Sequence, residues 1–354
     1  MKRLQTIMLF LILVSALGAQ TTNKYDLLTE PYIKRPYTLH QGLLQFSGSY
    51  SHIMGNNYFD GDGNKLDFNE VVSSVIEDAY YIKFGYGILE LLELNGEINM
   101  RNRFETLPTY FVSNNMNFGS ENTLYHYKGL GFLQLELKAR TPVFLSGFET
   151  FLSGGVTIPA GSGHPSQPDH AITIYNPADP GGSYELDYNF NPSPASPATF
   201  FHVSLGGRYS NNKVGISVNG TYTSPFKEVE TYYWKYRLYG YDFQYSTSHY
   251  TIRPKGNIHA GILFDLQLFP WFATYTGYNF DHETPGWSDQ TGQPVGLTTS
   301  SSGTALVGFE IQVSTHFRMI QQVYLPVTGK NRYSEFHILT GLTYTIAPVL
   351  KGSE

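Results

Sequence analysis

The stretch GNIHAGILFDLQLF, residues 256 to 269, alternates between apolar side chains and mostly polar ones. A side-chain period of two belongs to an extended strand, because a helix repeats every 3.6 residues. An average strand in a water-soluble protein has about five or six residues, whereas a tilted strand crosses a bilayer in roughly 9 to 11. The stretch therefore predicts a long strand with apolar surroundings on one face and polar surroundings on the other.

The same alternation recurs along the chain, and the connections between the alternating stretches differ in length in a regular way. Connections after stretches 1, 3, 5, 7 and 9 are long and rich in Asn, Asp, Gly, Pro and Ser, whereas those after stretches 2, 4, 6, 8 and 10 are mostly short, such as SNN at 210–212. The twelve stretches lie near residues 44–51, 75–86, 92–101, 125–139, 148–158, 200–210, 214–223, 256–268, 271–280, 305–314, 317–326 and 336–346.

This sorting of the loops predicts a meander through a membrane, with short periplasmic turns at one rim and long extracellular loops at the other. A soluble β-sandwich has no reason to sort its loops by parity. Closure also removes the edge strands, whose unpaired backbone groups would each cost several kcal/mol in hydrocarbon. We expect an all-β fold: a transmembrane antiparallel up-and-down β-barrel of about 12 strands.

The N-terminus has the features of a secretory signal peptide. Lys2 and Arg3 precede an apolar run from Ile7 to Val14, and small residues follow up to Ala19. The absence of cysteine excludes a lipid anchor and disulfides. We expect export to the outer membrane of a Gram-negative cell. The expected segments are a signal peptide at 1–19, an N-terminal periplasmic segment or plug at 20–40, a transmembrane β-barrel at 41–348 and a C-terminal tail at 349–354.

The apolar face of the expected strands is nearly free of charge, as a lipid-facing surface must be. A Lys or Arg there costs roughly 2 to 4 kcal/mol near the midplane. Asp78 is an exception, explained either by a position at the outer headgroups or by a bulge that shifts the register. Interfacial aromatic girdles are expected where aromatic residues fall near strand ends, at Tyr50, Tyr86, Tyr209, Tyr222, Phe269 and Trp271.

Three stretches resemble the outer-membrane family associated with phenol meta-pathway degradation, whose members are described as transporters: RPYTLHQGLLQFSGSYS (35–51), FGYGILELLELNGEI (84–98) and QVYLPVTGKNRYSEFHILTGLTYTI (322–346). In the second, Tyr86 to Ile88 and Leu92 to Leu94 match the family's hairpin. The turn, Leu89 to Leu91, departs from the Thr-Asp-Arg that the family tends to have. The resemblance implies an outer-membrane barrel and a transport function.

The inward face is expected to carry charges of both signs, which allows two interpretations. They either pair across neighbouring strands and replace a hydrophobic core, or they line a solute path and tune its selectivity. A barrel of about 12 strands is intermediate in width, which favours a restricted or partly plugged channel. Lys128 is also placed on this face. The residues predicted to line the path are Glu93, Glu97, Arg101, Glu136, Lys138, His202, Arg208, His259, Asp265 and Glu310.

No motif predicts catalysis, a metal site or a cofactor. DGDGNKLD at 60–67 resembles a calcium loop, but an EF-hand needs glycine and glutamate where this chain has Lys65 and Val71. The histidines lack the paired spacing of zinc ligands, and no G-x-S-x-G sequence occurs. SGHPSQPDH at 162–170 is better explained as a Pro-rich external loop. We expect no enzyme activity and no cofactor.

The function predicted first is passive passage of a small solute, hydrophobic or aromatic among the candidates, through an outer-membrane channel. The alternative is a structural or adhesive barrel whose long loops bind partners, to which the tyrosine-rich ETYYWKYRLYGYDFQY at 230–245 is suited. A hydrolase embedded in the barrel wall ranks third. The expected partners are the lipid bilayer and the solute. A formal net charge of −6 disfavours nucleic acid, and a monomer is favoured.

Overall fold

The computed structural model describes residues 31–67, 74–109, 112–113, 116–117, 121–141, 147–160, 198–239, 242–289 and 293–347. Strands dominate this part of the chain, and a short 3-10 helix, η1 (Tyr32–Lys34), precedes them. Within these residues, no helix has both the length and the hydropathy needed to cross a membrane.

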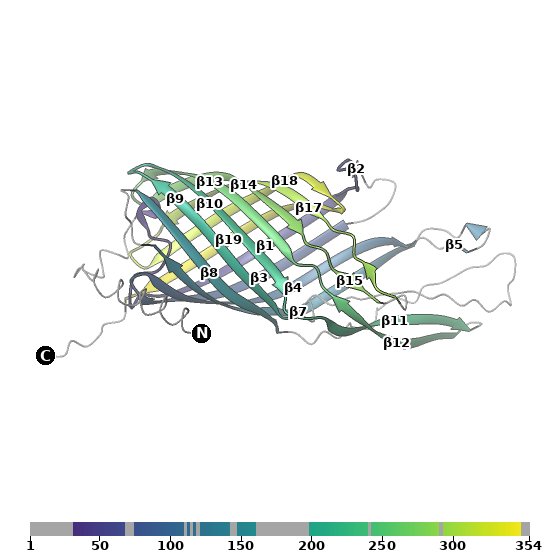
Figure 1. The fold of residues 1–354 in the computed structure, drawn as a ribbon. Helices are drawn as coiled ribbons and strands as arrows, with labels where there is room; N and C mark the ends of the chain where they lie inside the picture. Colours follow the sequence, from purple (N-terminus) through teal and green to yellow (C-terminus); the bar gives the residue numbers. More distant parts are fainter. Residues whose placement is uncertain are drawn as a thin grey trace, which may run out of the picture.

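Twelve antiparallel strands form a closed barrel, as the alternation predicts (Figure 1). Each strand pairs with the next along the chain, and the last strand pairs with the first from Leu44↔Ile346 to Phe59↔Arg332. Closure leaves the barrel without a free edge, so backbone groups along the wall are bonded. The strands are β1 (Leu44–Phe59), β3 (Ser74–Leu89), β4 (Leu92–Thr109), β7 (Glu121–Arg140), β8 (Phe148–Pro159), β9 (Phe200–Ser210), β10 (Val214–Pro225), β13 (Asn257–Phe269), β14 (Phe272–Glu283), β17 (Ser301–Gln312), β18 (Phe317–Lys330) and β19 (Arg332–Ile346).

The two rims of the barrel differ. At the short-turn rim, Glu90 and Leu91 alone join β3 to β4. At the long-loop rim, further strands extend beyond the barrel, toward the right of the view (Figure 1). One exception there is Asn331, which joins β18 to β19 by itself with a positive φ of 51°. The additional strands are β2 (Lys65–Asp67), β5 (Val112–Ser113), β6 (Met116–Asn117), β11 (Val229–Tyr239), β12 (Asp242–Arg253), β15 (Trp287–Ser288) and β16 (Val295–Gly296).

The outward face of the barrel is apolar and exposed, which reverses the arrangement of a water-soluble protein. On β13, four apolar residues of the outward parity are 37–46% exposed, namely Ile258, Ile262, Phe264 and Leu266, whereas Asp265 on the other parity is 2% exposed. At the short-turn rim, Phe269 and Trp271 are exposed and stack on each other. Such a surface requires hydrocarbon around it, flanked by interfacial aromatic residues.

Asp78 lies on the outward face in an unbroken register. β1 and β3 pair without a shift from Leu44↔Tyr86 to Gly55↔Val75, so the bulge considered for this position is wrong. The carboxylate instead accepts hydrogen bonds from the Tyr50 hydroxyl at 2.6 Å and from His52 Nδ1 at 2.7 Å. Two donors from the neighbouring strand therefore satisfy the exceptional charge.

A bulge between β4 and β7 reverses which side chains face inward in the part of β7 nearer the long-loop rim. Ile98 pairs with Leu133 but Met100 pairs with Leu130, so β7 carries one extra residue here. The Asn99 side chain stabilises the bulge, because its Oδ1 accepts a hydrogen bond from the Phe132 N–H at 2.8 Å. Lys128 pairs with Asn102, which in turn pairs with the outward Asp78. The prediction that Lys128 faces inward is therefore wrong.

Candidate solute path through the barrel

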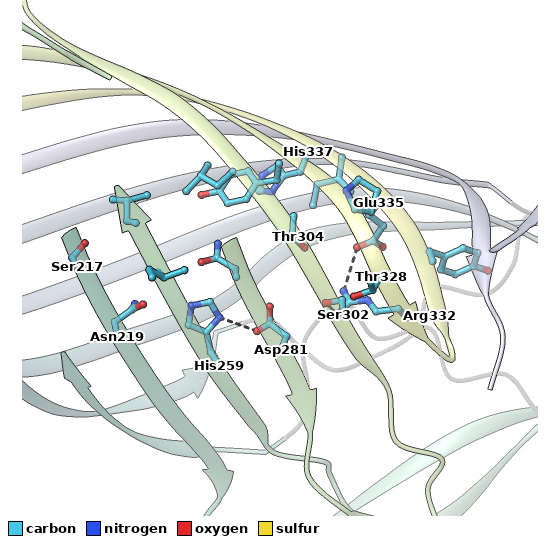
Figure 2. Close-up of a pocket in the computed structure, with 18 of the residues that line it drawn as sticks. Ser217, Asn219, His259, Asp281, Ser302, Thr304, Thr328, Arg332, Glu335 and His337 are labelled. Atoms are coloured by element: carbon cyan, nitrogen blue, oxygen red, sulfur yellow. Dashed lines mark hydrogen bonds and ion pairs between the residues drawn. The ribbon is translucent and has the colours of Figure 1, made fainter. Parts of the chain in front are cut away.

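The lumen holds an upper cavity of about 650 Å³, which reaches from Phe151 on β8 to Phe59 and Arg332 at the long-loop rim. One wall presents hydroxyl and amide groups from successive inward positions of β10, β14, β17 and β18 (Figure 2). These polar side chains are Ser217, Asn219, Asn279, Ser302, Thr304 and Thr328.

Charged pairs complete this wall. His259 Nδ1 lies 3.0 Å from Asp281 Oδ1, and Arg332 Nη2 lies 3.5 Å from Glu335 Oε2 (Figure 2). Arg332 also donates to the Ser302 hydroxyl at 2.7 Å. These four groups are thus partnered at the cavity surface, which limits the cost of exposing them to an apolar solute.

Rings and aliphatic side chains form the rest of the upper cavity. The Tyr324 ring stacks on the His337 imidazole, with centroids 4.7 Å apart and planes at 16°. Phe59, Tyr333 and Leu263 also line the space. The cavity therefore offers flat apolar surface together with hydrogen-bonding groups, as sites for small organic molecules do.

Residues 31–43, which we call the inner segment, enter the lumen near the short-turn rim and bond to carboxylates of the wall. The Tyr37 N–H donates to Glu149 Oε1 at 2.9 Å, and the Leu39 N–H donates to Glu93 Oε2 at 2.7 Å. Arg35 forms an ion pair with Glu310. Contacts from three distant strands, β4, β8 and β17, therefore hold this segment across the lumen.

The inner segment is also tied to the turn between β3 and β4. His40 Nδ1 lies 2.6 Å from Glu90 Oε1, and Arg140 Nη2 lies 3.0 Å from the same oxygen. Burial raises the pKa of Glu90, but the His40 hydrogen bond, the Gln41 N–H and the Arg140 charge outweigh it, so the pKa lies below its usual value. Glu90 is therefore ionised at neutral pH.

A lower cavity of about 240 Å³ lies on the other side of the inner segment, and Tyr37 and Lys138 line both cavities. The Tyr37 ring packs against the Phe151 ring with centroids 4.6 Å apart. Lys138 Nζ and Arg208 Cζ lie 5.6 Å and 5.0 Å from its centroid. Burial raises the pKa of Tyr37 to about 12, so the phenol is neutral. These side chains separate the two cavities.

Of the ten residues predicted to line a path, four lie around the inner segment. Glu93 and Glu310 bind it as described, and Arg208 donates to the Arg35 carbonyl and to Glu149 Oε2, the latter at 3.2 Å. Asp265 hydrogen-bonds the Tyr32 phenol and is almost fully buried. Burial raises the Tyr32 pKa well above its usual value.

The other six divide between the cavities and the wall. Lys138 borders both cavities and His259 lines the upper one. Glu136 lies 3.2 Å from His202 Nε2, forming a pair between β7 and β9. The remaining two are absent from both cavity surfaces and pair across strands: Glu97 with Lys83 at 2.6 Å and Arg101 with Glu77 at 3.6 Å. Glu97 and Arg101 therefore follow the first of the two interpretations, in which inward charges pair across neighbouring strands.

The sequence analysis missed several residues of the cavities. Asp281 lies one residue beyond the alternating stretch expected at 271–280, so the underestimated strand length hid it. Phe151 has the inward parity of Glu149, but only charged side chains were considered on that face. Nothing in the local sequence indicates that Tyr37 enters the lumen, because its partners are more than a hundred residues away.

Within the described residues, no group of three or more His, Asp or Glu side chains is placed to hold a metal ion. The DGDGNKLD stretch forms a turn in which Asp60 accepts from the N–H groups of Asp62 and Asn64, at 2.9 Å and 2.8 Å. Asp60 therefore caps its own loop.

No protein-family model matches the sequence, and a search of curated proteins finds no match. Among solved structures, the chain is similar to the COG4313 outer membrane channel from Pseudomonas putida F1, with 12% identity, 87% of this chain and 97% of that chain covered, and a TM-score of 0.58. The Pseudomonas putida toluene transporter TodX (9% identity, 93% and 95% covered) and the CymD monoaromatic hydrocarbon channel (7%, 87% and 88%) give TM-scores of 0.46 and 0.42. The first similarity shows that this chain has the fold of an outer-membrane channel, which agrees with the resemblance seen in its sequence.

Proposed function

We propose that this protein is an outer-membrane channel through which a small solute passes passively, with hydrophobic and aromatic solutes as the first candidates. The observation that carries the proposal is the pair of lumen cavities that meet at Tyr37 and Lys138. A barrel that served only as a scaffold would need no such pair of cavities. Passage needs no catalytic group and no energy input, and we propose none.

The outer membrane is the proposed location because closed barrels with an apolar outer belt belong to that bilayer. The exposed belt on β13 and its aromatic rim require hydrocarbon, and an aqueous compartment would leave this surface unfavourably hydrated. The short-turn rim, where the inner segment enters, is the proposed periplasmic side. A monomer suffices, since one chain closes the barrel.

The proposed path runs from the long-loop rim through the upper cavity to the inner segment. His259 and Asp281 contribute to its polar wall, and Lys138 and Arg208 stand at its narrow part. Glu93 and Glu310 act here through the inner segment that they hold. The proposed path thus combines a polar wall with aromatic surface, which suits solutes that are partly apolar.

Planar-bilayer recordings and liposome-swelling assays test this proposal. The purified barrel should conduct ions weakly, because the inner segment narrows the lumen, and it should accelerate the uptake of small aromatic solutes into liposomes. A folded, bilayer-inserted barrel that neither conducts nor accelerates uptake of any solute would overturn the channel function.

A second candidate, an adhesive or structural role, is supported by the sheet of β11, β12, β15 and β16, which extends beyond the barrel at the long-loop rim (Figure 1). Deleting the β11–β12 hairpin distinguishes the two functions. A channel should retain its conductance, whereas an adhesive protein should lose cell-surface binding. A wall-embedded hydrolase is less supported. It would need a serine hydroxyl beside a histidine and an acid on the outward face, whereas the hydroxyl beside His52 and Asp78 belongs to Tyr50.

A further inference from the structure

The Tyr37 ring occupies a pocket that we call the ring socket, formed by Phe151, Lys138, Arg208 and Ser217. Phe151 contacts the ring at a tilt of 56°, and the cations of Lys138 and Arg208 lie near its face. The Ser217 hydroxyl interacts with the phenol group. Such contacts suit a flat, electron-rich ring that carries a polar substituent.

The contacts of the ring are separable from those that anchor the inner segment. The backbone N–H of Tyr37 bonds to Glu149, and the neighbouring anchors are Arg35 with Glu310 and Leu39 with Glu93. Among the described residues, the ring itself makes ring–ring, cation–π and hydroxyl contacts. Any aromatic ring of similar size can make the same contacts without being part of the chain.

The ring socket lies where a solute must pass. Tyr37, Lys138 and Phe151 border the upper cavity, and the first two also border the lower one. A solute that reaches the inner end of the upper cavity therefore meets the Tyr37 ring. When that ring leaves the socket, its place opens to both cavities.

The charges around the socket favour an uncharged ring over an anion. Arg208 is paired with Glu149 at 3.2 Å, and Glu93 and Glu136 lie within electrostatic range of Lys138. Lys138 Nζ has no carboxylate oxygen within 4.0 Å among the described residues, and its close contacts are the rings of Tyr37 and Phe151, the latter at 4.7 Å. Its charge is thus directed at π-systems, while nearby carboxylates oppose a bound anion.

We infer that the ring socket is a binding subsite for an uncharged, electron-rich aromatic ring of the solute, and that Tyr37 occupies this subsite until the solute displaces it. The inference rests on the proposed channel function, which it deepens by naming the ring class and the residues that select it. Tyr37 acts as a tethered competitor, so it lowers the apparent affinity for solute in proportion to its occupancy.

Calorimetric titration of the full mature protein in detergent tests this inference, with 4-methylphenol as the probe because it reproduces the tyrosine side chain. Tyr37→Ala should bind 4-methylphenol at least about tenfold more tightly than the wild type, because the competitor is gone. Tyr81→Ala removes a ring from the inward face of β3 that borders neither cavity, and it should leave the affinity unchanged.

The ring class is tested in the Tyr37→Ala background with toluene and pentafluorotoluene. Toluene should bind roughly two- to fivefold more tightly, because fluorination reverses the charge of the ring face that the cations contact. Adding Lys138→Met should remove this difference, and adding Phe151→Ala should weaken both ligands. All variants lie in the lumen, and heat-modifiable migration on gels verifies that each barrel is folded.

Binding that is no tighter in Tyr37→Ala than in the wild type, or that ignores Lys138→Met and Phe151→Ala, would overturn the ring socket. This outcome is distinguishable from failure of the channel function, because titration in detergent does not depend on transport. A barrel that conducts but shows no ring binding keeps the proposed function and loses this inference. Preferential binding of benzoate over 4-methylphenol would also contradict it.

Discussion

Single residues decide how rings fit against the barrel wall. Gly206 on β9 pairs with Phe151 on β8, and the Phe151 ring lies over the space that a Cβ at Gly206 would occupy. The glycine lets the ring lie flat along the wall, where it meets Tyr37. A methyl group in place of a Gly206 Cα hydrogen would therefore collide with the ring that separates the two cavities.

Gly206→Ala should destabilise the barrel by about 1 to 3 kcal/mol, because the added methyl group displaces the Phe151 ring or the backbone. Gly207→Ala is the matched control on the same strand, since a Cβ there meets its nearest atom at 3.4 Å. Its effect should be small. Urea unfolding in lipid vesicles measures both, and equal destabilisation by the two substitutions would contradict the close approach of Phe151 to Gly206.

Asp78 shows what sequence reasoning resolves at this scale and what it leaves open. Its outward parity followed from the alternation, but the reason it is tolerated did not. Tyr50 and His52 come from a strand more than twenty residues away, and only the pairing of β1 with β3 brings them to the carboxylate. Local sequence carries no information about such cross-strand donors.

The inner segment is the element that makes this lumen narrow. Its contacts reach Glu90, Glu93, Glu149 and Glu310, at separations in the chain from about fifty to 275 residues. No periodicity describes a segment of this kind, which is why the sequence analysis left a periplasmic tail and a plug as alternatives. Strands were predictable because their pattern repeats locally, and this segment was not.

Removing residues 20–41 should raise the conductance, because Tyr37 and its neighbours then leave the lumen. Gly42 and Leu43 remain, with their backbone bonds to Gly87. Glu93, Glu149 and Glu310 lose the partners that the segment supplies, so the channel should also become more cation-selective. Single-channel conductance and reversal potentials in a salt gradient measure the two effects.

The control for this deletion carries the same deletion together with Glu93→Gln, Glu149→Gln and Glu310→Gln. That variant should keep the higher conductance and lose the cation preference, since the carboxylates are gone. An unchanged conductance in the deleted chain would mean that the inner segment does not limit the path.

Acidification should loosen the inner segment through Glu90. Burial raises the pKa of this carboxyl, but hydrogen bonds and the Arg140 charge lower it overall below its usual 4.5. A depressed pKa means that the contact with His40 is present at neutral pH and is lost as the pH falls through that lower value. Conductance recorded between pH 7 and pH 3 should therefore rise only at the acidic end.

Glu90→Gln lacks the titrating group, so it should show the looser state already at pH 7 and respond less to acid. If wild type and Glu90→Gln have the same pH profile, the anchor at the β3–β4 turn does not control the segment.

Across the whole molecule, strand number, closure and the sorting of long and short connections followed from the sequence, because each depends on a local pattern repeated twelve times. The bulge in β7 did not follow, and it moved Lys128 from the predicted inward face to the outward one. One inserted residue leaves the local composition unchanged and yet reverses every side chain beyond it. Parity predictions therefore hold between bulges and fail across them.

The alternation placed many charged residues on the inward face, but it did not indicate how the lumen is divided. Glu97 and Arg101 pair within the wall, whereas Lys138 and Arg208 approach a ring that the N-terminal part of the chain supplies. Which inward charges remain available to a solute depends on what fills the barrel. That information lies in long-range contacts.

The central claim is that hydrocarbon surrounds the outside of the barrel while the solute path lies within, and spin labels on β13 test it most directly. The chain has no cysteine, so Phe264→Cys and Leu263→Cys each provide a single attachment site on opposite faces. In lipid vesicles, the label at 264 should collide with oxygen dissolved in the bilayer, and the label at 263 with a water-soluble nickel chelate. The reverse pattern, or chelate access at both positions, would contradict the account.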